Sequence, residues 1–268
     1  MPDRYAVIGN PVAHSKSPWI HAEFARACGQ ELEYVRIEAP LDAFAATAET
    51  FCAAGGRGAN VTLPFKQEAF RYCASVSARA SEAQAVNTLV FDRGTPWGDN
   101  TDGVGLVRDL EVNLGFDLRG RRVLVMGAGG AAQGVLPSLR AQSPQRLVVA
   151  NRTPEKARAL AARFEGTAGC GYAELTPAQF DLVVNATSAG MAGELPPLPP
   201  LGLLLAPGAL VYDMVYGRDT PLLALARDAG VRTSDGAGML VEQAAESFFV
   251  WRGVRPDTRS VLAELRRG

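Results

Sequence analysis

The chain has 268 residues, of which 27 are lysine or arginine and 28 are aspartate or glutamate, and 47% are hydrophobic. This composition is that of an ordinary globular protein and excludes disordered, collagen-like and coiled-coil chains. The net charge of −1 argues against non-specific nucleic-acid binding, which needs a basic surface. Because the sequence has no apolar run of about 18 residues and no apolar leader, we expect a cytoplasmic protein without membrane contact.

In the first hundred residues, short apolar runs alternate with amphipathic stretches, which is the pattern of an α/β fold. Strands are predicted at 4–10, 33–39, 56–62 and 87–94. Helices are predicted at 18–28, 41–54, 64–73 and 101–113, with a turn at 94–98.

After a polar connector at 115–122, the strands become continuous apolar runs, as in a parallel sheet covered on both faces. These strands are predicted at 121–127, 146–151, 181–187 and 209–215, with a proline-rich loop at 193–202 and C-terminal helices at 239–251 and 257–267. The sequence therefore predicts a first α/β domain over 1–101, a second over 102–238, and C-terminal helices over 239–268 that return to the first domain.

Few residues are available for metal or redox chemistry. The four cysteines and two histidines have no spacing typical of a zinc site or a disulfide framework, so we expect free thiols and no metal. Only Lys16, Lys66 and Lys156 are lysines; all other cationic side chains are arginines. Because arginine does not release its proton in a protein, each lysine is a candidate for proton transfer, although Lys16 and Lys156 are equally explained by chance.

A glycine motif follows the strand predicted at 121–127. Gly127, Gly129 and Ala132 form a G-x-G-x-x-A pattern between this strand and a helix. Gly127 permits a tight turn, Gly129 lets the backbone approach a pyrophosphate, and the helix N-terminus faces the phosphates. The strand–glycine–helix order favours a dinucleotide site over a plain glycine-rich turn.

The residues after the next strand indicate which dinucleotide is bound. An NAD-dependent enzyme places a carboxylate there, but this sequence has Asn151, Arg152 and Thr153, with Lys156 one turn later. Arginine can hold a 2′-phosphate that a carboxylate would repel, so NADP is favoured. Thr153 and Pro154 are also typical of a helix start, and both interpretations can hold together.

The first domain contains polar residues at predicted strand–helix junctions. Ser15 and Ser17 lie just before a helix and could hold a small carboxylate, although Ser17 could simply cap that helix. Further polar residues occupy the other junctions, where open α/β sheets bind ligands. They suit a polyhydroxylated molecule and proton transfer by a lysine–carboxylate pair, and are Asn60, Thr62, Lys66, Asn87 and Asp102.

These motifs resemble the shikimate dehydrogenase family over nearly the whole chain. The matching segments include GNPVAHSKSPWIH from Gly9, NVTLPFK from Asn60, AVNTL from Ala85, DNTDGVG from Asp99, GAGGAA from Gly127, NRT from Asn151, NATSAGM from Asn185, YDMVY from Tyr212, TPLL from Thr220 and GMLVEQAAESFFVW from Gly238. The resemblance implies reduction of 3-dehydroshikimate to shikimate by NADPH in aromatic amino-acid biosynthesis. It also implies an N-terminal substrate domain, a Rossmann-type doubly wound NADP domain, and a deep cleft between them.

The resemblance also implies roles for particular residues. Lys66 and Asp102 would be catalytic. The substrate carboxylate would be held by Ser15, Ser17 and Tyr216, and the ring hydroxyls and carbonyl by Thr62, Lys66, Asn87, Asp102 and Gln243. The pyrophosphate would contact Gly127, Ala128, Gly129, Gly130 and Ala131, the 2′-phosphate Asn151, Arg152, Thr153 and Lys156, and the nicotinamide Met214 and Gly236.

The sequence departs from the family pattern at two places, the loop that sets the position of Tyr216 and the segment after Lys66. The loop after Tyr216 is shorter than the family's usual version, and 75–81 contains no acid that could support Lys66. A sister enzyme that oxidises quinate, or uses NAD, is the nearest alternative, and a non-catalytic metabolite sensor of the same fold is another. We expect a small-molecule substrate and no macromolecular partner, with the chain either a monomer or a homodimer.

Overall fold

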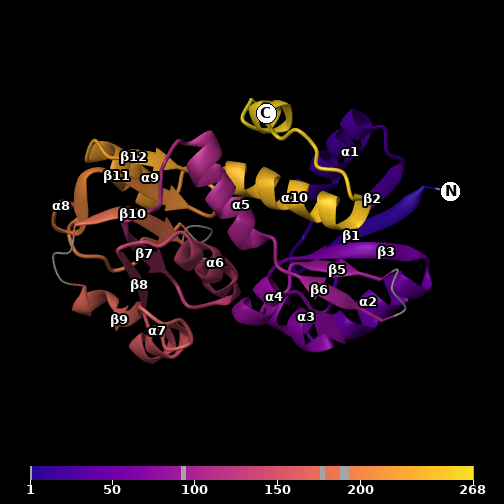
Figure 1. The fold of residues 1–268 in the computed structure, drawn as a ribbon, viewed down its shortest axis with the longest axis horizontal. Helices are drawn as coiled ribbons and strands as arrows, with labels where there is room; N and C mark the ends of the chain where they lie inside the picture. Colours follow the sequence, from indigo (N-terminus) through magenta and orange to yellow (C-terminus); the bar gives the residue numbers. More distant parts are fainter. Residues whose placement is uncertain (1, 92–94, 176–178, 188–192, 268) are drawn as a thin grey trace. The chain divides into compact units, whose positions relative to one another are not determined.

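A computed structural model describes residues 2–91, 95–175, 179–187 and 193–267 (Figure 1). The chain divides into two compact units, one formed by residues 1–106 together with 241–268 and the other by residues 107–240. Helices α5 (Asp102–Arg108) and α10 (Ala237–Arg252) carry the chain from one unit to the other. Within the described ranges, no helix is both long enough and apolar enough to cross a membrane.

The first unit is built on a mixed sheet with the strand order β2-β1-β3-β5-β6-β4. Its strands are β1 (Asp3–Gly9), β2 (Leu32–Glu38), β3 (Gly56–Val61), β4 (Ser75–Val76), β5 (Thr88–Val90) and β6 (Trp97–Asp99). Its other helices are α1 (Ser17–Cys28), α2 (Phe44–Ala53), α3 (Lys66–Tyr72), α4 (Ala78–Ala83) and α11 (Arg259–Leu265). β1 is parallel to β2 and β3, whereas β5 is antiparallel to β3 and β6.

Helices cover both faces of this sheet. This arrangement buries β1, which carries apolar side chains on both of its faces. Tyr5 and Val7 pack with Trp251 of α10, and the alternating residues Ala6 and Ile8 belong to the core that includes side chains of α2 and α3. Figure 1 shows α1 on the same face as the first-unit part of α10, with α2 and α3 on the other. The two sets of helices therefore bury opposite faces of the same strands.

The second unit has a six-stranded parallel sheet with the order β12-β11-β10-β7-β8-β9. Its strands are β7 (Arg122–Met126), β8 (Arg146–Asn151), β9 (Thr167–Gly171), β10 (Phe180–Asn185), β11 (Leu205–Asp213) and β12 (Arg232–Ser234). Its helices are α6 (Gly130–Ala141), α7 (Pro154–Ala161), α8 (Leu201–Leu204) and α9 (Pro221–Asp228), with a short 3-10 turn η2 (Tyr172–Glu174).

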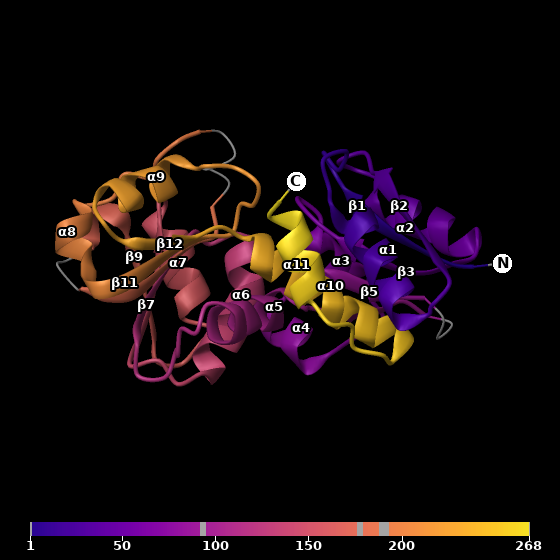
Figure 2. The ribbon, with the colours of Figure 1, turned by 90° about the horizontal axis from the view of Figure 1, so that it is seen from above.

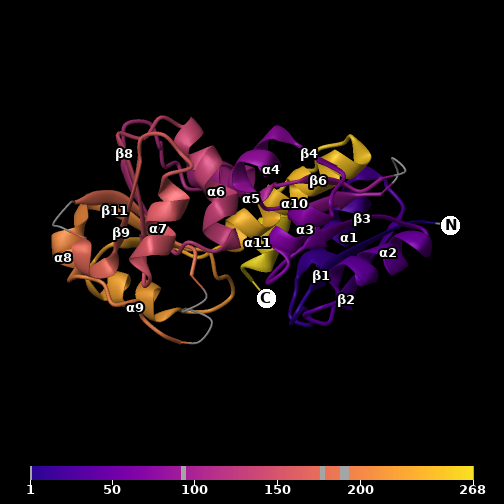
Figure 3. The same ribbon diagram turned by 90° about the horizontal axis from the view of Figure 1, so that it is seen from below.

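This strand order defines a Rossmann-type doubly wound fold. Counted from β7, it is the order 3-2-1-4-5-6 read from the other edge. Figures 2 and 3 show α6 and α7 on one side of the sheet and α9 on the other. The chain reverses its winding between β7 and β10, which is where such sheets bind nucleotides.

Several short elements differ from the sequence prediction. The turn predicted at 94–98 is wrong in its second half, because Trp97–Asp99 form β6, which pairs with β5. β4 and α4 were not predicted either, and the loop predicted at 193–202 runs into α8. Strands of two or three residues carry too little alternation to be recognised. Residues 92–94 of the predicted strand 87–94 lie outside the described residues.

The helix predicted over 101–113 begins at Asp102 and changes to a π-helical turn, η1 (Asp109–Asn113). Asp109 is fully buried there, and its carboxylate accepts hydrogen bonds from the Tyr212 hydroxyl at 2.7 Å and the Asn113 amide at 3.0 Å. Gly238 lies directly against this carboxylate, since a Cβ at that position would lie 1.8 Å from Asp109 Oδ1. The close approach explains why a glycine stands in the first turn of α10.

We expect Gly58→Ala to lower the free energy of unfolding by about 2–3 kcal/mol. A Cβ on Gly58 would lie 2.5 Å from Trp251 Nε1 and 2.6 Å from the Leu89 carbonyl oxygen. The indole already donates a hydrogen bond to that oxygen at 2.9 Å, so the methyl group would break it. Thermal unfolding measures the effect, with Gly202→Ala as the control because a Cβ there meets nothing within 4 Å. Equal stability of the two variants would contradict this packing.

Candidate functional site

The polar centre of the first unit is an ion pair between Lys66 and Asp102. Lys66 is the first residue of α3 and Asp102 the first of α5, and Lys66 Nζ donates to Asp102 Oδ2 at 2.6 Å. The side chains are only 13% and 5% exposed, so this charge pair is largely removed from water. The Lys66 carbonyl also accepts a hydrogen bond from the Val86 amide at 2.9 Å, which ties the start of α3 to the approach of β5.

Asn87 and Gln243 extend this pair into a cluster. The Asn87 side-chain amide donates to Asp102 Oδ1 at 2.8 Å and lies 3.3 Å from Gln243 Oε1. Gly105 of α5 permits the approach of α10, since a Cβ there would lie 2.7 Å from the Gln243 backbone nitrogen. The structure therefore brings together four residues predicted from the sequence, Lys66, Asp102, Asn87 and Gln243.

Thr62 takes no part in the hydrogen bonds of this cluster. Its backbone amide donates to the Ile8 carbonyl at 2.9 Å, and its carbonyl accepts from the Phe65 amide at 3.0 Å. Among the described residues, the Thr62 hydroxyl has no hydrogen-bond partner. The Leu63–Pro64 peptide bond that follows is cis.

Buried hydroxyl groups form hydrogen bonds to Asn87 and to one another, and they hold the Asn87 side chain in place. The Ser247 hydroxyl, on α10, lies 2.8 Å from Thr88 Oγ1 and 3.1 Å from Thr101 Oγ1. Asn60 donates to Ser247 at 2.9 Å and accepts from the Tyr34 hydroxyl at 2.7 Å. Sequence reasoning identified Asn60 but missed the roles of Tyr34, Ser247 and Thr88, because a serine or tyrosine inside a regular element carries no motif.

A second group missed from the sequence consists of Arg79 and Arg255 with the acids Asp99 and Glu246. Arg79 donates two hydrogen bonds to the buried Asp99 carboxylate, at 2.7 and 2.5 Å, and a third to Glu246 at 2.9 Å. Arg255 contacts the other oxygen of Glu246. Burial opposes the charge of Arg79, but Asp99 and Glu246 together raise the pKa of its guanidinium above the usual value. The segment 75–81 lacks an acid. Its arginine, Arg79, instead holds Asp99 at the end of β6, from which the chain continues to Asp102.

Ser15 and Ser17 form a small polar turn at the start of α1. Both are buried, and their hydroxyl oxygens lie 3.2 Å apart. The Arg36 guanidinium donates two hydrogen bonds to the Ser15 carbonyl, at 3.0 and 2.6 Å. The interpretation of Ser17 as the helix cap is wrong, because Lys16 occupies the capping position and provides no side-chain hydrogen bond.

His21, on α1, is a fully buried imidazole. It stacks on Tyr34 with ring centroids 4.4 Å apart, and Trp251 and Phe248 lie near its other sides. Neither ring nitrogen has a hydrogen-bond partner among the residues that the structure describes. Burial lowers the pKa of His21 to about 3, so the side chain is neutral and acts as an aromatic core residue.

The glycine turn of the second unit leads from β7 into α6. Gly127 has a φ of +107°, which favours glycine, and a Cβ there would lie in tight contact, 3.1 Å from the Ala186 carbonyl oxygen. A Cβ on Gly129 would meet nothing within 4 Å, and Gly129 caps α6 without a side-chain hydrogen bond. Gly130 and Ala131 begin the helix, so the predicted residues 127–131 form an open turn at a helix N-terminus. This geometry fits a pyrophosphate.

The segment after β8 presents two cationic groups. Arg152 and Lys156 are exposed, and among the described residues neither forms an ion pair or hydrogen bond through its charged group. Nearby Arg158 differs, since it binds Glu174 at 2.7 Å. Asn151 donates to the Thr153 carbonyl at 3.1 Å, and Thr153 caps α7 without a side-chain hydrogen bond. The two unpaired charges fit a 2′-phosphate.

The remaining predicted residues are Met214 and Tyr216, in the loop after β11, and Gly236, which follows β12. Met214 donates from its backbone amide to the Asn185 carbonyl at 3.0 Å, and Tyr216 lies half-buried in the same loop. Gly236 packs against Met214, since a Cβ there would lie 2.3 Å from the Met214 carbonyl oxygen. The buried Asp213 carboxylate accepts from Thr220 at 2.7 Å and so closes the loop. Residues 188–191 of the NATSAGM motif lie outside the described residues.

The described parts of the chain contain no group of three or more histidine, cysteine, aspartate or glutamate residues that could hold a metal ion. The features that remain are a buried lysine–carboxylate pair in a mixed-sheet unit and an open glycine turn in a Rossmann-type unit. Together they define a two-unit α/β protein of the dinucleotide-dependent oxidoreductase class.

Comparison with known proteins identifies the family. Residues 7–89 match the shikimate dehydrogenase substrate binding domain, residues 110–192 the shikimate / quinate 5-dehydrogenase family, and residues 236–266 the shikimate 5′-dehydrogenase C-terminal domain. A shikimate dehydrogenase (NADP(+)) from Dechloromonas aromatica is 56% identical over 271 residues, covering 99% of this chain and 98% of that protein. The chain therefore belongs to the shikimate dehydrogenase family.

Solved structures agree with this assignment. An Ael1 enzyme from Pseudomonas putida has a TM-score of 0.91 at 50% identity, covering 98% of both chains. The shikimate 5-dehydrogenase from Thermus thermophilus, in complex with NADP(H) and shikimate, has a TM-score of 0.87 at 35% identity, covering 99% of both chains. The predicted α/β fold, with its N-terminal substrate-binding domain and Rossmann-type domain, is confirmed by these relatives and family models.

We expect His21→Phe to flatten the pH dependence of stability. His21 has a folded pKa of about 3, whereas the unfolded value is about 6.5. Between these values the unfolded chain binds the extra proton, so the wild type loses stability as the pH falls. Urea unfolding at about pH 8 and about pH 5 should show a loss about 2 kcal/mol smaller in the variant than in the wild type. The same loss in both proteins would show that His21 does not titrate on unfolding.

Proposed function

We propose that this protein is an NADP-dependent shikimate dehydrogenase, which reduces 3-dehydroshikimate to shikimate with NADPH in aromatic amino-acid biosynthesis. The buried Lys66–Asp102 pair carries this proposal, because reduction of a ketone requires a proton donor beside the carbonyl oxygen. We propose further that the first unit binds the substrate and the second binds NADP, with domains over 1–101 plus 239–268 and over 102–238.

In this proposal, Lys66 donates a proton to the alkoxide oxygen that forms as the ketone is reduced, and takes it back in the reverse reaction. Asp102 accepts the hydrogen bond of the Lys66 ammonium and so holds it in one position. Asn87 fixes the other oxygen of Asp102, which keeps the carboxylate from rotating away. NADPH, when bound, supplies the hydride from its nicotinamide ring.

The remaining polar residues of the first unit would orient the substrate. Thr62, Asn87 and Gln243 carry the hydroxyl and amide groups suited to ring hydroxyls, in addition to Lys66 and Asp102. Ser15 and Ser17 offer two neighbouring hydroxyls for the carboxylate. Tyr216, from the loop after β11, is the third residue that we assign to the carboxylate.

For NADP, the open turn of residues 127–131 would hold the pyrophosphate through backbone amides and the N-terminus of α6. Asn151, Arg152, Thr153 and Lys156 would bind the 2′-phosphate. Met214 and Gly236, whose backbones are in close contact, would line the nicotinamide site. No acidic residue follows β8 at the position where an NAD-dependent enzyme would place one.

Absorbance of NADPH provides the direct test of the function. The purified protein should reduce NADP with shikimate much faster than with quinate, and much faster than it reduces NAD. Comparable rates with quinate or NAD would favour the broader quinate/shikimate enzyme. No rate with either substrate would favour a metabolite sensor.

We also propose that the protein acts in the cytoplasm on small molecules alone, as a monomer or homodimer.

We expect Lys66→Ala to lower kcat by about 100-fold or more with little change in KM for shikimate, because its interaction strengthens mainly as charge develops. Lys66→Arg should be nearly as poor, since arginine holds its proton too tightly. Steady-state kinetics with circular dichroism as the folding check provides the measurement. Near wild-type turnover in a folded Lys66→Ala protein would remove Lys66 from the mechanism.

We expect Arg152→Ala to weaken NADPH binding by about 10-fold or more while changing NADH binding by less than about twofold. The guanidinium would contact only the 2′-phosphate, which NADH lacks. Fluorescence titration of both nucleotides measures the difference, and Arg158→Ala is the matched control because Arg158 already pairs with Glu174. Equal weakening of both nucleotides would count against 2′-phosphate recognition.

A further inference from the structure

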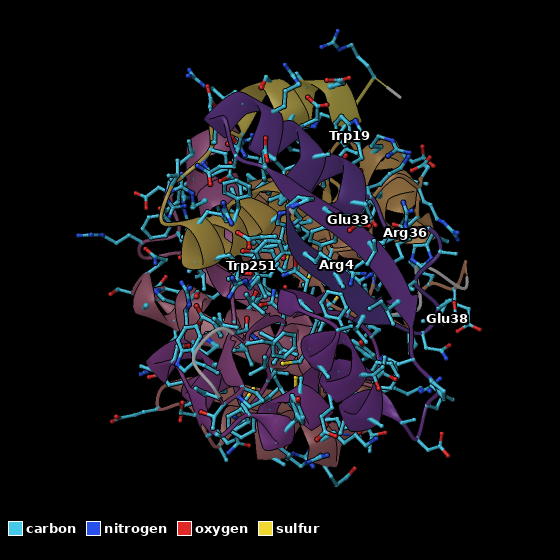
Figure 4. All side chains as sticks on the ribbon, turned by 90° about the vertical axis from the view of Figure 1, so that its right-hand side faces the viewer. Arg4, Trp19, Glu33, Arg36, Glu38 and Trp251 are labelled. Carbon is cyan, nitrogen blue, oxygen red and sulfur yellow. The ribbon has the colours of Figure 1, made fainter. Side chains whose placement is uncertain are left out.

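Arg36 lies on the face of β2 that also carries Tyr34, and its guanidinium binds a backbone carbonyl. Its Nε and one terminal nitrogen both donate to the Ser15 carbonyl, at 3.0 and 2.6 Å. These two hydrogen bonds from the Arg36 guanidinium therefore hold the backbone of the turn that contains Ser15 and Ser17. Figure 4 shows Glu33, Arg36 and Glu38 along the edge strand β2, with Arg4 on the neighbouring strand β1.

The charge of Arg36 is not neutralised by this contact. Arg4 pairs with Glu33 at 3.2 Å, and Arg57 pairs with Asp3 at 3.3 Å. Arg36, in contrast, has no carboxylate within 4 Å among the described residues, and a carbonyl oxygen carries no formal charge. A positive charge thus lies at the Ser15 carbonyl, in the same turn as two buried serine hydroxyls that are themselves neutral.

These two observations fit an anion on the serine turn. Two hydroxyl groups alone bind a carboxylate weakly, because neither carries a charge to offset its desolvation. A guanidinium that is hydrogen-bonded to the turn supplies that charge and holds the backbone of Ser15, whose hydroxyl donates to the Ser17 hydroxyl at 3.2 Å. Lys16 is exposed in the same turn, but its side chain forms no hydrogen bond to any described residue and fixes nothing.

We propose that Arg36 is a positioning residue for the substrate carboxylate, acting through Ser15 and through its uncompensated charge. This inference rests on the proposed function, in which Ser15 and Ser17 bind the carboxylate of shikimate. Arg36 acts before the chemical step, so its loss weakens substrate binding without slowing hydride or proton transfer. Arg36 is exposed and lies outside the hydrophobic cores, so its replacement leaves the fold intact.

Steady-state kinetics and calorimetric binding of shikimate to Arg36→Gln test the proposal. KM and Kd for shikimate should rise by about 10- to 100-fold, with kcat and KM for NADP within about twofold of the wild type. Arg36→Lys retains the charge but cannot donate two hydrogen bonds to the Ser15 carbonyl from a planar guanidinium. Its KM and Kd for shikimate should lie between those of the wild type and those of Arg36→Gln. Arg4→Gln is the matched control, because Arg4 also joins the sheet to a backbone carbonyl, that of Ala54, without approaching the serines.

The methyl ester of shikimate separates recognition of the carboxylate from a general structural effect. Arg36→Gln should change kcat/KM for the ester by less than about twofold, because the ester presents no negative charge. An equal loss for acid and ester, a loss confined to kcat, or the same loss in Arg4→Gln would overturn the proposal. If the wild type binds shikimate without oxidising it, the proposed function fails while the Kd comparison still decides the role of Arg36. If the wild type does not bind shikimate at all, both fail.

Discussion

The buried ion pair of Lys66 and Asp102 is the interaction on which the polar structure of the first unit depends. Removing two charges from water is unfavourable unless they are paired and their remaining hydrogen-bonding groups are satisfied. Asn87 satisfies the second oxygen of Asp102, and the Asn100 side chain accepts a hydrogen bond from the Asp102 amide at 3.1 Å. The pair therefore constrains the start of β5, the end of β6 and the starts of α3 and α5 together.

The arginines of this protein are of two kinds, and the difference relates structure to function. Arg79 and Arg122 are held by carboxylates and stabilise the fold, Arg79 by bridging Asp99 and Glu246 and Arg122 by binding Asp181. Arg36 and Arg152 have no carboxylate partner among the described residues, and each stands where our proposals place an anionic group of a ligand. A cation without a carboxylate partner at a polar turn is a stronger indication of a ligand than the number of arginines in the sequence.

The candidate site was predicted from the sequence where residue type and local spacing carried the signal. Lys66, Asn87 and Asp102 stood at strand–helix junctions, and the ends of neighbouring strands meet at one sheet edge, so their proximity could be inferred. The prediction of Gln243 rests mainly on family resemblance, since a glutamine on a helix has no chemical pattern of its own. Arg79 was missed because its partners, Asp99 and Glu246, are 20 and 167 residues away in the chain.

The sequence by itself determined the class of fold, the two-domain order and the glycine turn, because apolar periodicity and glycine requirements are local properties of the chain. Only the tertiary structure decided that Trp97–Asp99 form a strand and that Arg36 holds a carbonyl instead of an acid. Each of these depends on which distant groups lie within hydrogen-bonding distance. Such pairings arise from the packing of the whole unit, and no short window of residues contains them.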